Sequence, residues 1–136
     1  MDFGSINWWT ILICVVVSMI VGSLWFNPKT FFDVWWEAIG RKPNEQPGTD
    51  NMAMVFGLTI LSSFVQAVSM WFMAGVMGGN SWGSGMMVGF MLWLGFVAPT
   101  ALTNKLFAGH IKAWFIEQGS HLVTFLLLGA ITGAMR

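Results

Sequence analysis

Two groups of polar residues stand at helical spacing inside otherwise apolar segments. Glu117, His121 and Thr124 fall at i, i+4 and i+7, so they share one face of a helix. An ionisable pair within a membrane span is a candidate site, and this pair would relay a proton or hold His121 charged. The plainer interpretation is an acidic residue near the start of a helix. His110 would complete a metal site only on one continuous helix, which Gly109 argues against, so no metal is predicted.

The second group forms a polar stripe on one earlier apolar segment, the predicted span 52–77. Thr59, Ser62, Gln66 and Ser69 are three or four residues apart. Such a stripe either lines a path for a small polar solute or makes hydrogen bonds between helices, worth about 0.6 kcal/mol each. Both interpretations stay open. The residues of the candidate polar path or pocket are Gln66, Ser62, Ser69, Glu117, His121 and Thr124.

Composition identifies the environment of these groups. Of 136 residues, 56% are apolar and 9% are charged, whereas a soluble domain carries about 25% charged residues. The formal net charge is zero, so no basic field exists that would attract nucleic acid. The single cysteine excludes a disulfide within the chain. The composition therefore predicts an integral membrane protein whose partner is the lipid bilayer.

Four segments are long enough to cross a bilayer core of about 30 Å, which needs about 20 helical residues. Backbone polar groups lack water partners in lipid, so each span must be helical. The first apolar segment follows no basic region and is expected to be retained rather than cleaved. One membrane domain, 1–136, is predicted, with short polar loops between the spans. The predicted spans are 6–26, 52–77, 84–102 and 113–135, and the loops are 40–51, 78–83 and 103–112.

The distribution of basic residues predicts an orientation. Five basic residues, against the single Arg136, fall on one side of the predicted spans. Because Lys and Arg collect on the cytoplasmic side, both termini are expected to face away from the cytoplasm. We expect a multi-pass membrane protein with this orientation. The five basic residues are Lys29, Arg41, Lys42, Lys105 and Lys112.

A short amphipathic helix is predicted over 28–40, between the first span and the first loop. Asn27 and Pro28 suit its start, and Gly40 suits its end. Its bulky residues share one face, so it is expected to lie in the membrane interface, where tryptophan is favoured. The predicted interface anchors are Trp8, Trp9, Phe31, Phe32, Trp35, Trp36 and Trp114.

Glycines at intervals of four residues predict close helix packing. Ser81, Gly85 and Gly89 form one such face, and Gly129 and Gly133 form another. Lipid provides no hydrophobic drive for helix pairing, so pairing rests on close approach of small residues. One face is expected to pack within the chain. The other, with Gly129 as its centre, is expected to bind a second copy.

Several stretches resemble one known family. They are "INWWTILICVVVSMIVGSLWFNPKTFFDVWWEAIG", "LWLGFVAPTALTNKLF" and "FIEQGSHLVTFLLLGAITG". The pattern resembles small bacterial membrane proteins of domain of unknown function 1761 over most of the chain. The resemblance implies a four-helix membrane fold. It implies no activity.

These observations predict an all-α membrane protein of four transmembrane helices plus one interfacial helix. No phosphate-binding loop, dinucleotide motif or nucleophile elbow is present, so no enzyme and no cofactor is predicted. Because four short helices leave little room for an enclosed cavity, a non-enzymatic homo-oligomer or subunit of a larger complex is expected first. The alternatives are a carrier or channel for a small solute or ion, and, behind it, an enzyme acting on a lipid or quinone.

Overall fold

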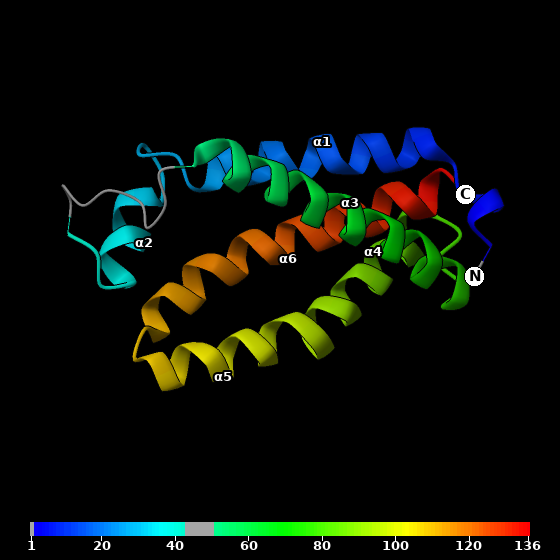
Figure 1. The fold of residues 1–136 in the computed structure, drawn as a ribbon. Coiled ribbons are helices and arrows are strands. Elements are labelled where there is room, and N and C mark those ends of the chain that lie inside the picture. The colour runs from blue at the N-terminus through cyan, green and yellow to red at the C-terminus, as the bar shows by residue number, and fades with distance from the viewer. Residues whose placement is uncertain (1, 43–50) are drawn as a thin grey trace.

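The computed structural model describes residues 2–42 and 51–136, and every long element in them is a helix. A short 3-10 turn, Phe3–Ser5, precedes α1. Figure 1 shows both ends of the chain at one end of the bundle, with α2 at the opposite end. The helices are α1 (Trp8–Trp25), α2 (Phe32–Ala38), α3 (Met52–Val76), α4 (Trp82–Leu92), α5 (Ala98–Ala108) and α6 (Ile111–Ala134).

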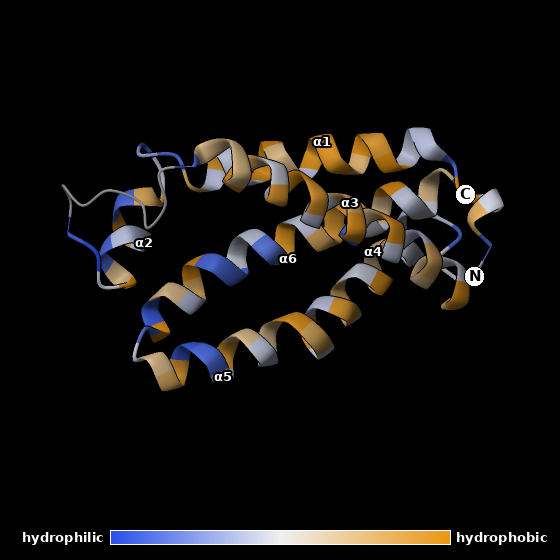
Figure 2. Ribbon diagram, viewed as in Figure 1, coloured by the Kyte–Doolittle hydropathy of each residue, from blue (hydrophilic) through white to orange (hydrophobic). Residues whose placement is uncertain are grey.

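Four helical segments are long and apolar enough to span a membrane. They are α1, α3, the continuous helix Trp82–Ala108 and α6. Figure 2 shows hydrophilic residues gathered at the α2 end and along the first half of α6, whereas α1 and α3 are largely hydrophobic. The all-α membrane fold with four spans is therefore confirmed.

The helix α6 lies at the centre of the bundle. It packs against α1, α3, α4, α5 and α2, and a larger share of it is buried than of any other span. Leu128 is fully buried among Ile11, Cys14 and Phe125 in the apolar core. Because α6 is shielded from lipid by its neighbours, it is the span best able to carry polar side chains.

Glycine faces bring α4 and α6 into backbone contact. A Cβ built on Gly85 would collide with the carbonyl oxygen of Gly129, and one built on Gly129 would collide with that of Gly85. A Cβ added to Gly89 would likewise collide with the backbone of Phe125, and one added to Gly133 would collide with the backbone of Ser81. The two faces thus pack against each other inside one chain. The expectation that the Gly129 face stays free for a second copy is wrong, because α4 covers it.

The third span is longer than predicted, because helix continues through 103–108, where a loop was expected. A π-helical turn, Trp93–Val97, precedes Pro99 and connects α4 to α5 without a break. Two threonine hydroxyls donate hydrogen bonds to carbonyls one turn earlier in the helix. Thr100 donates to the Phe96 carbonyl at 2.9 Å, and Thr103 donates to the Pro99 carbonyl at 3.2 Å. Gly109, with φ of 76°, ends α5. The expected loop therefore shrinks to two residues, 109–110.

The short helix after α1 begins later than predicted. Asn27 does not cap it. Instead its Oδ1 accepts a hydrogen bond from the Lys29 backbone N–H at 2.9 Å and closes a separate turn. The Thr30 hydroxyl donates to the Leu24 carbonyl at 2.6 Å and fastens this turn to the end of α1. Helix α2 therefore starts at Phe32 rather than Pro28. Gly40, with φ of 85°, follows its end as predicted.

Candidate functional site

A cavity of about 620 Å³ lies among α1, α3, α6 and α2. It occupies the half of the bundle nearer α2. The cavity is open at the surface of the bundle, so the expectation that four helices leave little room for an enclosed cavity stays a prediction. Its polar lining residues are Ser18, Ser23, Thr59, Ser62, Ser63, Gln66, Ser120, His121 and Thr124, and its other lining residues are Met19, Gly22, Phe26, Phe32, Trp35, Val55 and Phe56.

Several polar side chains in the lining make no hydrogen bond to any described residue: Ser23, Ser62, Gln66, Ser120, His121 and Thr124. The hydroxyls of Ser18 and Thr59 donate to carbonyls of their own helices, at 2.9 and 2.7 Å. Neither the amide of Gln66 nor the imidazole of His121 hydrogen-bonds to any residue in the described ranges. Gln66 belongs to α3 and His121 to α6, and both line the cavity. They are the groups best placed to bind a ligand's polar atoms.

The lining of the cavity carries few ionisable side chains. Among its described lining residues there is no Asp, Glu, Lys or Arg, and His121 is the sole ionisable group. A charged ligand would find no formal counter-charge there, at a depth where an unpaired charge is costly. The lining therefore suits a neutral molecule.

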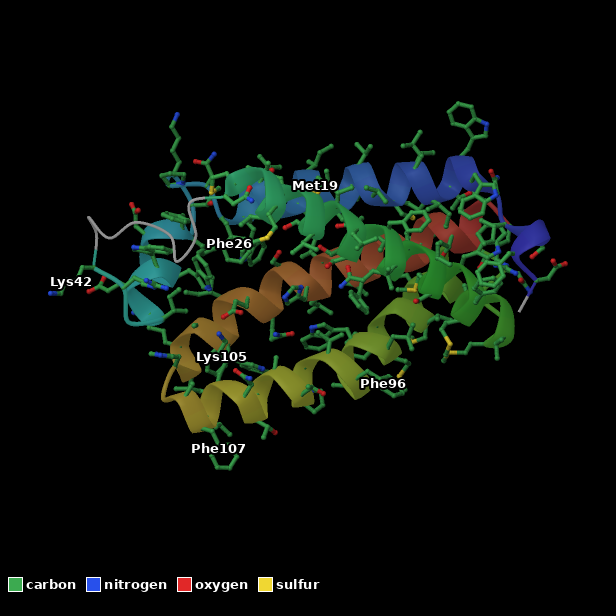
Figure 3. The ribbon with its side chains drawn as sticks, viewed as in Figure 1. Met19, Phe26, Lys42, Phe96, Lys105 and Phe107 are labelled. Atoms are coloured by element: carbon green, nitrogen blue, oxygen red, sulfur yellow. The ribbon has the colours of Figure 1, made fainter. Side chains whose placement is uncertain are left out.

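Aromatic side chains close the α2 end of the cavity. The rings of Phe26 and Trp35 meet edge to face with centroids 5.1 Å apart, and Phe32 stands beside Trp35 at 6.0 Å. Figure 3 shows Phe26 between α2 and the first half of α6. The Trp35 Nε1 is buried and has no hydrogen-bond acceptor among the described residues.

Four of the six residues predicted to form a polar path line this cavity. These are Ser62, Gln66, His121 and Thr124. Ser69 is exposed on α3 and lies outside it. Glu117 is also outside, because it forms an ion pair with α5: Lys105 Nζ lies 3.0 Å from its Oε2, and Figure 3 shows Lys105 between α5 and α6.

Glu117 forms its ion pair with Lys105, and its interaction with His121, one helical turn away, is electrostatic without a hydrogen bond. The sequence predicts a loop at 103–112, whereas Lys105 lies in α5 and so reaches Glu117. Among the described residues the structure has no hydrogen bond between Glu117 and His121. A proton relay between the two is therefore not supported by their geometry.

Other polar contacts, between the third span (Trp82–Ala108) and α6, were not predicted from the sequence. Gln118 is buried, and its Oε1 accepts a hydrogen bond from Trp93 Nε1 at 3.1 Å. The Trp114 Nε1 donates to the Ala98 carbonyl at 3.0 Å, so this half-buried residue, a predicted interface anchor, contacts α5. The signal for Gln118 was available: a tryptophan in mid-span needs an acceptor for its N–H.

Three cavity residues of α1 were also missed. Ser18, Gly22 and Ser23 are small residues in an apolar helix, and spacing of four between Ser18 and Gly22 was the available signal. Elsewhere, the described residues contain no group of three or more His, Cys, Asp and Glu side chains arranged to hold a metal ion.

Comparison with known proteins identifies the family of this chain. The family model described as protein of unknown function (DUF1761) matches residues 9–133, nearly the whole chain. The chain belongs to the DUF1761 family. The match covers all four spans of this DUF1761 protein and every residue that lines the cavity. Searches of curated proteins and of solved structures find no match.

Proposed function

We propose that this protein binds a small neutral molecule in the cavity among α1, α3 and α6 and acts as a membrane carrier for it. The observation that supports the proposal is the lining itself. Gln66 and His121 present free hydrogen-bonding groups within the spans, and the described lining contains no Asp, Glu, Lys or Arg. The nearby Glu117, one helical turn from His121, is paired with Lys105. Carriers commonly hold their substrates near the middle of the bilayer.

The position of Gly22 provides a direct test. A Cβ built on Gly22 would meet no atom within 4 Å, and the residue lines the cavity. Gly22→Leu therefore fills the cavity without a backbone clash and is expected to lower ligand affinity at least about tenfold, or 1.4 kcal/mol. Native mass spectrometry of the protein in mild detergent would detect the bound molecule, and flux into liposomes would measure transport.

Gly57→Leu is the matched control for Gly22→Leu. Gly57 is a helical glycine of α3 whose added Cβ would also meet nothing within 4 Å, but it does not line the cavity. It should leave both binding and flux unchanged. Equal ligand occupancy in the Gly22→Leu variant and the parent would refute the proposal.

We further propose that the α2 end faces the cytoplasm of a bacterial cell whose inner membrane holds the protein. The basic residues Lys29, Arg41, Lys42 and Lys112 lie at or near that end, as the positive-inside rule requires. Short aromatic helix α2 would then lie in the inner interface, with Arg41 stacked 5.5 Å from the Trp36 ring centre.

Cysteine labelling tests this orientation. In a Cys14→Ala background, a cysteine at Asn80 should react with an impermeant thiol reagent on intact spheroplasts, because Asn80 is exposed between α3 and α4. A cysteine at Lys112 should react only after lysis. Reaction of the Lys112 variant from outside would mean the opposite topology.

A second candidate function is assembly into a homo-oligomer or a larger complex. The supporting observation is α3, which is the least buried span and exposes the hydroxyl-bearing Ser69 beside Val65 and Phe72 on its surface. Ser69→Trp should reduce oligomer mass in light scattering if α3 is the contact. An unchanged mass, or a monomeric parent, would exclude assembly through this face.

A further inference from the structure

A shallow groove runs along the outer surface between α1 and α3. Its volume is about 540 Å³, and its walls are almost entirely aliphatic. Several of its residues are well exposed, Ile20 at 52% and Leu24 at 63%. The residues that belong to the groove alone are Val15, Val16, Ile20, Leu24 and Ile60.

The groove is continuous with the cavity. Met19 and Ser23, one helical turn apart on α1, line both. On the α3 side, the cavity residues Phe56, Thr59 and Ser62 are exposed, so the cavity opens at the surface between these two helices. Figure 3 shows Met19 on α1 beside α3. A methionine side chain is unbranched and adaptable, so this wall can yield to a passing chain.

We propose that the ligand is a neutral single-chain amphipath that enters the cavity sideways from the bilayer. Its polar group, a hydroxyl or carbonyl, bonds to Gln66 and His121 in the cavity. Its hydrocarbon chain passes Met19 and lies in the groove between α1 and α3. This inference rests on the proposed function and specifies its substrate class and its route of entry.

The chemistry of the two compartments supports this division. Bilayer lipid is as apolar as the groove walls, so a chain gains little affinity by moving from lipid into the groove. Selectivity must come from the hydrogen bonds of the head in the cavity. A cationic or anionic head would lack a counter-charge there, which favours the neutral head.

Photocrosslinking in liposomes tests the proposal. The probe is hexadecanol with a diazirine in the middle of its chain, and mass spectrometry locates the crosslinks. We expect them on α1 between Val15 and Leu24 and at Ile60 of α3. Unlabelled hexadecanol should compete, whereas hexadecyltrimethylammonium and hexadecyl phosphate should not. Gly22→Leu should reduce crosslinking at least about tenfold.

A pair of tryptophan substitutions tests the groove separately from the cavity. Ile20→Trp fills the groove and should lower crosslinking at least about fivefold. Leu61→Trp is the control, because Leu61 is 54% exposed on α3, close to the 52% of Ile20, but lies outside the groove. Equal thermal midpoints of the two variants would show that both are folded.

The outcomes separate this inference from the proposed function. Two results would overturn the inference, because either would indicate ordinary lipid contact. One is unchanged crosslinking in the Gly22→Leu variant, and the other is equal competition by the charged amphipaths. If short-chain butanol binds in a Gly22-sensitive manner while Ile20→Trp has no effect on either alcohol, the groove is no subsite, but the cavity still binds neutral solutes. If neither alcohol binds in a Gly22-sensitive manner, both proposals fail.

Discussion

Gly129→Leu is expected to separate α4 from α6 and to lower the stability of the protein by about 3 kcal/mol or more. Even the Cβ of the new side chain would overlap the carbonyl group of Gly85. Backbone of two packed helices cannot move aside as a flexible side chain does, so the helices must part. For a chain of this size, about 3 kcal/mol corresponds to a fall in thermal midpoint of roughly 10 °C.

The control for Gly129→Leu is Gly57→Leu, whose added Cβ meets no atom within 4 Å. It should keep the parent midpoint in the same detergent. Circular dichroism during heating measures both variants, and light scattering measures their mass. A Gly129→Leu variant that retains its midpoint but loses oligomer mass would mean that this face contacts another chain instead.

Lys105→Met is expected to destabilise the α5–α6 contact by about 2 kcal/mol. It would leave Glu117 charged and without its partner, with only 20% of that side chain exposed. Breaking a fully buried ion pair costs about 3–5 kcal/mol, and the partial exposure of this pair reduces the penalty. The double variant Lys105→Met with Glu117→Gln removes the charge and should recover most of the loss.

Lys112→Met provides the comparison for Lys105→Met. Lys112 is exposed at the start of α6, so its loss should change stability by less than about 0.5 kcal/mol. Equal losses for the two lysine variants, or no recovery in the double variant, would show that the ion pair contributes nothing specific. Unfolding in mixed micelles would measure all four proteins.

Hydropathy was sufficient to predict the four spans, because each must satisfy its backbone internally and present an apolar surface to lipid. The same reasoning failed after Pro99. Asn104 and Lys105 looked like loop residues, but a hydrogen-bonded helix extends through them and Lys105 finds an acidic partner on α6. Polar residues at the end of a span are either solvated in a loop or paired with a residue of another helix. Only the tertiary structure distinguishes these two cases.

The cavity was predictable only in part. Helical spacing predicted that Ser62 and Gln66 share a face, and likewise His121 and Thr124. It did not predict which helix each face meets, so Glu117 was grouped with His121 instead of Lys105. The contribution of α1 was invisible in the same way, because Ser18 and Gly22 matter only through the space they leave.

The central position of α6 has a consequence for how the protein is made. Chains emerge from the ribosome in sequence order, so α1, α3 and α4 enter the bilayer before the helix that joins them. Contacts such as Thr10 with Met135, separated by 125 positions, cannot form until then. During that interval the face of α4 formed by Gly85 and Gly89 has no helix packed against it. Biogenesis should therefore have a late, slow step, the docking of α6, during which insertion chaperones and membrane proteases compete for the unfinished chain.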